Sequence, residues 1–233
     1  KTWKRRLLEN ARDFLKQGRL FPSRLRAFDV PMARKIYFLD EGILGKARKI
    51  FTKPIQLGPF PEWLDPSVST DSYLPAEISR FAGEKKTMCL CGFLSRRKGL
   101  LTLLRGAPFL SDAWFFVFAG PIEEDGFSNE ERELITGAVK NSEGRFLFIN
   151  RLMKDAEVKT VVQSCNAVYV AYEDFFHSSN IQLKAAAFGK PMIAGPQHLI
   201  SERTNRFKMG WCLPELTEWA VVDLLNSIDK KEI

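Results

Sequence analysis

Residues 87–99 read TMCLCGFLSRRKG, and this stretch decides the fold class of the chain. It begins with a run of mostly apolar side chains, which is typical of a strand buried on both faces. Gly92 ends the run, and the turn that follows contains three consecutive cations: Arg96, Arg97 and Lys98. A helix is predicted directly after the turn, over residues 100–110. The stretch therefore predicts a strand, a basic turn and a helix in immediate succession.

The same alternation continues through the rest of the chain. Further strands are predicted at residues 114–119, 145–149, 167–172 and 191–194, and further helices at 129–140, 155–164, 181–188 and 215–227. Near-continuous apolar strands that alternate with helices imply a parallel sheet covered on both faces. We therefore expect residues 85–233 to form an α/β domain with a doubly wound, Rossmann-like parallel sheet.

Residues 1–84 are expected to be a partial or reduced amino-terminal segment. Residues 2–17 have apolar side chains at helical spacing with basic residues between them, which predicts a basic amphipathic helix. Three short elements are predicted after it: strands at 36–39 and 55–57 and a helix at 42–51. Residues 58–72 contain three prolines and predict a linker. Two short strands are thin for an independent domain, so this segment belongs to a larger or a reduced one.

The charge of the chain favours an anionic partner. Its formal net charge is +7 and its pI is about 9.3, and many of the basic residues lie in the first 26 positions. Nucleic acid, an anionic membrane face and a phosphorylated small molecule all fit this charge. The basic helix favours either peripheral membrane contact through residues 1–20 or docking on the protein itself. Nucleic-acid binding ranks last, because no basic-aromatic module of a known nucleic-acid fold is present.

The sequence predicts a cytoplasmic protein without a bound metal. No apolar run approaches the roughly 20 residues that span a bilayer, and no signal peptide is recognised. The chain begins with Lys1, so whether it is a fragment stays open. We expect its four cysteines to be reduced, buried thiols, and its two histidines are too few to support a zinc site. The acidic run at 123–125 is expected to be solvated rather than to bind Mg²⁺.

A second loop, residues 174–180, is expected at the same edge of the sheet as the basic turn. Ligands of such sheets bind at the carboxyl ends of strands, where the strand order reverses. Ser178, Ser179 and Asn180 are candidate helix caps that leave amides free to meet phosphate. His177 is a candidate for ligand contact or proton transfer, and a purely structural role is the alternative. Arginine and lysine in the first turn suit a diphosphate, and the alternative there is a solvated basic turn.

Residues 183–194, LKAAAFGKPMIA, resemble the helix–glycine–strand passage of retaining GT-B glycosyltransferases of the family 4-like group. In that group the passage usually reads Leu-Glu-Ala-x-Ala-x-Gly-x-Pro-Val-Ile-Ala. Gly92 followed by Lys98 and Gly99 is similar to the group's Gly-x5-Lys-Gly turn. Residues 114–120 and 146–151 resemble its second strand and the strand that leads to its base-binding loop. Four such passages occur in the family's order.

The resemblance implies a glycosyltransferase, or its donor-binding half, that uses a nucleotide diphosphate-sugar. The acceptor, a sugar, lipid or protein, would belong to the other domain. Arg96, Arg97 and Lys98 would neutralise the diphosphate together with the amides of residues 178–180. The base would lie near Asn150, Arg151 and Leu152. Enzymes of this class generally need no metal for their donor, so no cofactor is expected.

The sequence departs from the family at two acidic positions, and Phe93 stands where many relatives carry an Arg, although Arg96 and Arg97 keep that loop basic. Lys184 stands where the family commonly has a Glu that holds the ribose hydroxyls, and Phe176 stands where a second Glu touches the sugar. A lysine cannot accept hydrogen bonds, so Lys184 is expected to meet a phosphate and to leave nucleoside recognition poor. Glu173 and Asp174, with His177, are the candidates for the sugar contact and catalysis. The alternative hypothesis is a degenerate, non-catalytic GT-B-like module that binds a protein partner or a membrane surface.

Overall fold

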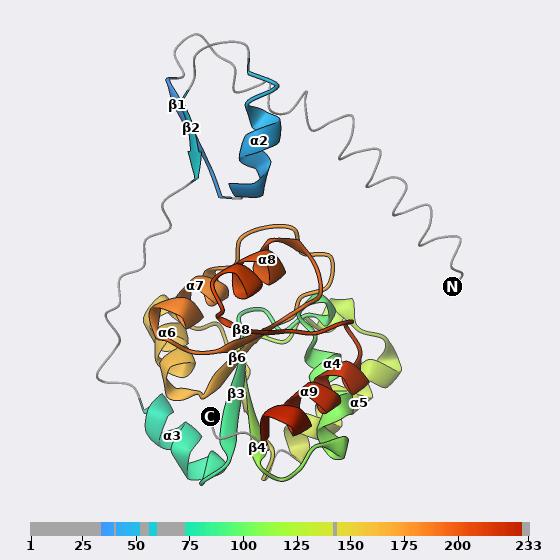
Figure 1. Ribbon diagram of the computed structural model, residues 1–233. Coiled ribbons are helices and arrows are strands. Elements are labelled where there is room, and N and C mark those ends of the chain that lie inside the picture. Colours follow the sequence, from blue (N-terminus) through green and yellow to red (C-terminus); the bar gives the residue numbers. More distant parts are fainter. Residues whose placement is uncertain (1–33, 40, 52–55, 60–72, 142–143, 230–233) are drawn as a thin grey trace. The chain divides into compact units, whose positions relative to one another are not determined.

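The computed structural model describes residues 34–39, 41–51, 56–59, 73–141 and 144–229 of the chain (Figure 1). The chain divides into two compact units, Lys1–Glu62 and Trp63–Ile233. The basic helix predicted at 2–17 lies outside the described residues, and so does most of the linker predicted at 58–72.

The first unit contains a small βαβ arrangement. Its elements are β1 (Lys35–Phe38), the 3-10 turn η1 (Glu41–Ile43), α2 (Leu44–Ala47) and β2 (Gln56–Pro59). β1 pairs with β2 in parallel, with Lys35 opposite Gln56. Ala47 and Phe51 are buried, and Ile36, Phe38 and Ile50 pack against them. The two predicted strands are therefore confirmed, and the helix between them is shorter than expected.

The second unit is built on a six-stranded sheet. Its strands are β3 (Lys86–Cys91), β4 (Trp114–Ala119), β5 (Phe146–Ile149), β6 (Ala167–Val170), β7 (Met192–Ala194) and β8 (Gly210–Cys212). Their order is β5-β4-β3-β6-β7-β8, and every adjacent pair is parallel. The predicted α/β class and the doubly wound parallel sheet are confirmed.

Helices cover both faces of this sheet. They are α3 (Leu74–Ala82), α4 (Leu100–Gly106), α5 (Asn129–Lys140), α6 (Asp155–Ser164), α7 (Asn180–Ala187), α8 (His198–Arg206) and α9 (Glu218–Asp229). In Figure 1, α4, α5 and α9 lie on one side of the strands and α3, α6 and α7 on the other. Short 3-10 turns add η2 (Arg96–Lys98), η3 (Ala107–Phe109) and η4 (Glu124–Gly126). Within the described ranges, no helix is long and apolar enough to cross a membrane.

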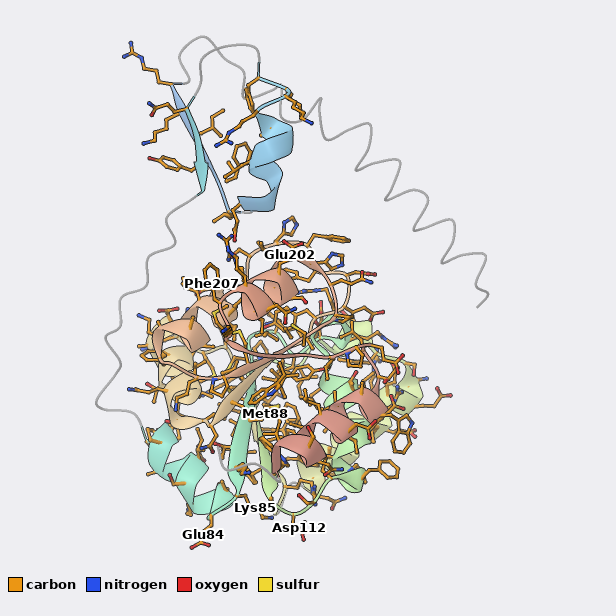
Figure 2. The ribbon with its side chains drawn as sticks, viewed as in Figure 1. Glu84, Lys85, Met88, Asp112, Glu202 and Phe207 are labelled. Atoms are coloured by element: carbon orange, nitrogen blue, oxygen red, sulfur yellow. The ribbon has the colours of Figure 1, made fainter. Side chains whose placement is uncertain are left out.

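The core follows from the apolar strands. Every residue of β4 is buried, because helices cover it on both faces. Phe116 and Phe118 of β4 lie two residues apart and share a face, where they meet Phe146 and Phe148 of β5 with ring centres 4.8–6.1 Å apart. Met88 of β3 is buried in the same core, whereas Lys85 and Asp112 lie at the amino ends of β3 and β4 (Figure 2). Because successive side chains of a strand point to opposite faces of the sheet, every second residue of β4 and β5 lies on the same face.

The strand order reverses between β3 and β6. The chain moves from β3 outward through β4 to β5, then returns through α6 and adds β6 to the other side of β3. Asn166, just before β6, anchors this return, since its side-chain oxygen accepts from the backbone N–H of Thr87 at 2.8 Å. The loops that leave β3 and β6 therefore start from neighbouring strands at one edge of the sheet, where α/β folds bind ligands.

Three elements of the second unit were not expected from the sequence: α3, α8 and β8. Leu74, Ile78 and Ala82 recur every four residues in α3 and are buried in the main core. These residues, which the sequence assigned to the amino-terminal segment, therefore pack with the second unit. β8 is only three residues long, too short for a periodic pattern, and α9 begins at Glu218 rather than at residue 215.

Candidate functional site

The turn after β3 is held against the end of β4 by close backbone approaches. Gly92 donates its N–H to the carbonyl of Ala119, and Leu94 donates to that of Pro121, both at 2.8 Å. A Cβ on Gly120 would lie only 2.2 Å from the carbonyl oxygen of Gly92, and Gly120 has a φ of 140°. Glycine is therefore needed at position 120, because any side chain there would push the turn away from the sheet.

The three consecutive cations of this turn have different partners. Arg96 donates to the carboxylate of Glu131 on α5 and, at 3.3 Å, to the carbonyl of Gly126. The ammonium of Lys98 donates to the carbonyl of Cys91 at 2.7 Å. Arg97 is exposed, and its guanidinium lies 4.7 Å from the ring centre of Phe175. Among the described residues Arg97 makes no ion pair, so its charge is the one available to a ligand.

Lys98 lies beneath the turn rather than on its surface. A Cβ on Gly92 would come within 2.4 Å of its Nζ, and the ring centre of Tyr172 is 5.4 Å away. Burial lowers the pKa of Lys98 to about 8, although the nearby Cys91 favours the charged form. The ammonium of Lys98 therefore loses its proton at a lower pH than that of a free lysine.

The loop after β6 lies directly beside this turn. Glu173 donates its N–H to the carbonyl of Arg97 at 2.7 Å, which joins the two loops. Asp174 has a φ of 48°, an uncommon conformation for a residue other than glycine. The ring of Phe175 contacts those of Tyr172 and His177, with centres 5.5 and 5.9 Å apart. The aromatic contacts therefore fix the path of the loop.

A pocket of about 650 Å³ opens where these loops meet the loop after β4, and we call it the switch-point pocket. Its lining residues are Phe93, Ser95, Arg96, Arg97, Glu123, Gly126, Glu173 and Asp174. The pocket brings the two arginines of the basic turn beside Glu173 and Asp174. Lys98 and residues 177–180 are not among its lining. Such a pocket offers cations to phosphate and carboxylates to hydroxyl groups.

Solved structures with a similar fold share this arrangement of strands. HepE from Anabaena, in complex with UDP, matches with a TM-score of 0.66 at 14% identity over 90% of this chain. Sucrose-phosphate synthase from Thermosynechococcus elongatus matches with a TM-score of 0.64 at 18% identity over 93% of it. The fold is that of GT-B glycosyltransferases.

This chain matches only part of each full-length neighbour, and the similarity is found by comparing structures, not sequences. The chain spans 58% of the HepE chain and 54% of the synthase. It also covers 89% of the C-terminal domain of the glycosyl transferase LpcC from Francisella tularensis, with a TM-score of 0.57 at 14% identity over 72% of this chain. No protein-family model and no curated protein matches the sequence. The fold is therefore that of the C-terminal domain of GT-B glycosyltransferases, and activity is a separate question.

In this GT-B fold, the polar residues before α7 hold the start of the helix. The hydroxyl of Ser179 accepts from the N–H of Gln182 at 3.3 Å and so caps the helix, as predicted. Ser178 accepts from Arg203 of α8 at 2.8 Å. Asn180 is the first residue of α7, and the first amides of a helix lack partners within it. The helix start is therefore rigid and presents N–H groups to the edge of the sheet.

Asn150 and Arg151, predicted near the base, have structural partners in the loop after β5. The side-chain oxygen of Asn150 accepts from the N–H of Ile122 at 2.9 Å. Arg151 donates to both carboxylate oxygens of Glu157, at 3.1 and 2.6 Å, and to the hydroxyl of Tyr73. The hydrogen bond from Arg151 lowers the pKa of Glu157 to about 2. These contacts fix the loop, and both side chains already have partners within the protein.

Lys184 is enclosed rather than open to a ligand. Its side chain is only 2% exposed, and its ammonium contacts Asp155 Oδ1 at 2.8 Å and Asn180 Oδ1 at 2.5 Å. The expectation that Lys184 meets a phosphate does not fit this position, because its charge is already paired inside the protein. Phe176, the other departure, is 39% exposed and contacts the ring of His198 at a tilt, with ring centres 4.1 Å apart.

Several residues that shape the site were not singled out from the sequence. Glu131 binds Arg96, Arg203 donates to Ser178, Asp155 pairs with Lys184, and the ring of His198 contacts that of Phe176. Each lies on a different element from its partner, so sequence spacing gives no signal for these pairs. Only the Ser128–Glu131 capping box in α5 is visible as a local pattern.

Proposed function

We propose that this chain is the donor-binding half of a glycosyltransferase and binds a nucleotide diphosphate-sugar. The observation that carries the proposal is the meeting of the loops after β3 and β6, where Arg97 lies unpaired beside the switch-point pocket. Solved structures with this fold support it, since HepE was crystallised with UDP and with UDP-glucose. A sugar, lipid or protein acceptor would be held by a second domain.

The chemistry of the site suits a diphosphate leaving group. Arg97 would donate two parallel hydrogen bonds to phosphate oxygens, and the amides at the start of α7 would add dipolar stabilisation. Both act most strongly when the glycosidic bond breaks and charge builds on the diphosphate. Glu173 and Asp174 would accept hydrogen bonds from the sugar hydroxyls, and His177, exposed two residues before the Ser179 cap, is the candidate for proton transfer.

A non-catalytic GT-B-like module is the second candidate. Its support is that the ring of Phe176 contacts that of His198 and Lys184 is buried, because in the resembled family both positions carry acidic residues that hold the donor. Such a module would keep the fold and an anion-binding edge but would lack turnover.

Thermal unfolding of the full chain with UDP and UDP-glucose tests the proposal. A ligand at 100 times its dissociation constant stabilises a protein by about 2.7 kcal/mol, which shifts the melting temperature measurably. Absence of any shift at millimolar concentrations refutes donor binding. A shift accompanied by UDP release from UDP-glucose supports the enzyme, and a shift without release under a panel of acceptors supports the non-catalytic module.

A further inference from the structure

The ion pair between Lys184 and Asp155 joins two helices at the carboxyl edge of the sheet. Lys184 lies on α7, and Asp155 is the first residue of α6. The side chain of Lys184 is 2% exposed, whereas that of Asp155 is 60% exposed. A buried ammonium needs a partner, since leaving one unpaired is costly. Lys184 therefore fixes the position of a carboxylate that still faces solvent.

The carboxylate of Asp155 has unused hydrogen-bonding capacity. Lys184 contacts Oδ1 at 2.8 Å and Lys159 contacts Oδ2 at 3.1 Å. An ionised carboxylate accepts about four hydrogen bonds, so roughly half of its capacity remains. The hydrogen bond from Lys184, with a smaller contribution from Lys159, lowers the pKa of Asp155, so it is ionised at neutral pH.

Asp155 also lies where a nucleoside would extend from the proposed diphosphate position. Lys184 is four residues after Asn180, the first residue of α7, so it lies about 6 Å along the helix from the amides that would meet phosphate. Asp155 directly follows the loop after β5. The ribose is the unit that separates phosphate from base in a nucleotide, and a fixed carboxylate is the group that commonly binds its hydroxyls in doubly wound folds.

We infer that Asp155 accepts hydrogen bonds from the ribose hydroxyls of the donor nucleotide, with Lys184 as the residue that positions it. The inference rests on the proposed function and names a specificity residue for it. It replaces the expectation drawn from the sequence that Lys184 leaves the site with poor nucleoside recognition. Instead, the ribose acceptor is Asp155 on the neighbouring helix α6, and Lys184 on α7 holds its carboxylate in place.

Calorimetric titration of the full chain with UDP, 2′-deoxy-UDP and pyrophosphate tests this assignment. The natural protein should bind UDP about tenfold more tightly than 2′-deoxy-UDP, because hydrogen bonds to a charged acceptor are among the strong ones. Asp155→Asn keeps the shape of the side chain and an acceptor for Lys184. It should weaken UDP binding about 10- to 100-fold and leave pyrophosphate within about twofold.

Two further variants separate ribose recognition from general effects. Asp112→Asn removes an exposed, ion-paired carboxylate at the opposite edge of the sheet (Figure 2) and should change none of the three affinities. Lys184→Met removes the ammonium that positions Asp155. It should weaken the binding of UDP and leave the binding of pyrophosphate unchanged.

The outcomes distinguish this inference from the proposed function. If the natural protein binds UDP but Asp155→Asn binds it equally well, or loses pyrophosphate to the same extent, Asp155 is not the ribose acceptor and the proposed function stands. If the natural protein binds neither UDP nor UDP-glucose, the proposed function fails and this inference fails with it.

Discussion

The loop after β3 and the loop after β6 meet at one edge of the sheet, yet they are built differently. The first is held by its backbone, through Gly92 and Gly120, and its side chains diverge to separate partners. The second is held by its side chains, through the rings of Tyr172, Phe175 and His177 and the cap at Ser179. A site at a switch point therefore needs one loop fixed by close approach and one fixed by packing.

The comparison also shows that adjacent charges are not equivalent. Arg96, Arg97 and Lys98 are neighbours in the sequence, but Glu131 holds the first and the carbonyl of Cys91 holds the third. Arg97 alone stays unpaired within the described residues, because it projects over the ring of Phe175 in the other loop. The availability of a charge depends on what the neighbouring elements offer it.

Replacing Gly120 with alanine should break the first loop most severely. The new Cβ would lie 2.2 Å from the carbonyl oxygen of Gly92, at a φ of 140°. Strain and overpacking together should lower the free energy of unfolding by about 2–6 kcal/mol in urea titrations. Gly189→Ala is the control, since nothing lies within 4 Å of its Cβ position, and it should cost only about 1–2 kcal/mol. Equal losses in the two variants would show that the close approach is not essential.

The buried ammonium under the first loop should make stability depend on pH. Its pKa is about 8 in the folded protein, below the value of a free lysine, so the unfolded chain binds more protons between about pH 8 and 10.5. Stability should therefore rise with pH across this window, by on the order of 2 kcal/mol relative to Lys98→Met. Urea unfolding at pH 7 and pH 10 without ligand measures it. Lys140→Met, at an exposed position, should keep the natural profile.

The two arginines of the first loop should differ in their effect on ligand affinity. Arg97→Ala should weaken UDP binding about 10- to 100-fold, because a charge-assisted contact to phosphate is lost. Arg96→Ala should change it less than about threefold, since Glu131 already holds that side chain. Calorimetry on both variants measures the contrast. Similar losses would mean that Arg96 leaves Glu131 when a ligand binds.

The smallest effect is expected at the cap of the second loop. Ser179→Ala removes the hydroxyl that accepts from Gln182 and should lower the free energy of unfolding by about 1 kcal/mol. Ser128→Ala removes the equivalent cap from α5 and should cost a similar amount. Only the Ser179 variant should also weaken UDP binding, because α7 faces the proposed ligand. Thermal unfolding and calorimetry together test this, and a loss of affinity in both variants would point to a global effect.

Much of the fold was predictable because apolar strands leave a strong local pattern. The bounds of α5 and α6 match the predicted ranges, and the strands of the sheet deviate by at most a few residues. The misses have physical causes. Three residues of β8 carry no periodicity, and α3 buries only three side chains, so its pattern is short. Residues 183–194 resemble the GT-B passage, and the structure confirms a similar fold.

The sequence predicted which loops carry the candidate site, but not which side chains contact one another there. The sequence indicated the loops after β3 and β6 because the topology of a doubly wound sheet requires ligand loops there. It did not indicate that the ammonium of Lys184 pairs with Asp155, which lies on another helix. Local spacing carries no information about such a contact, since α6 and α7 come together only when the sheet forms.

The sequence by itself determined the elements, the parallel sheet and the edge that carries the candidate site, because periodicity and glycine placement act over a few residues. The tertiary structure alone decided which cation is free, which carboxylate is exposed and which loop rests on which strand. Those outcomes depend on burial and on partners distant in the chain. Lys184 and Asp155 look unrelated in the sequence, but they form one ion pair, with the lysine buried and the aspartate exposed, when α6 packs against α7.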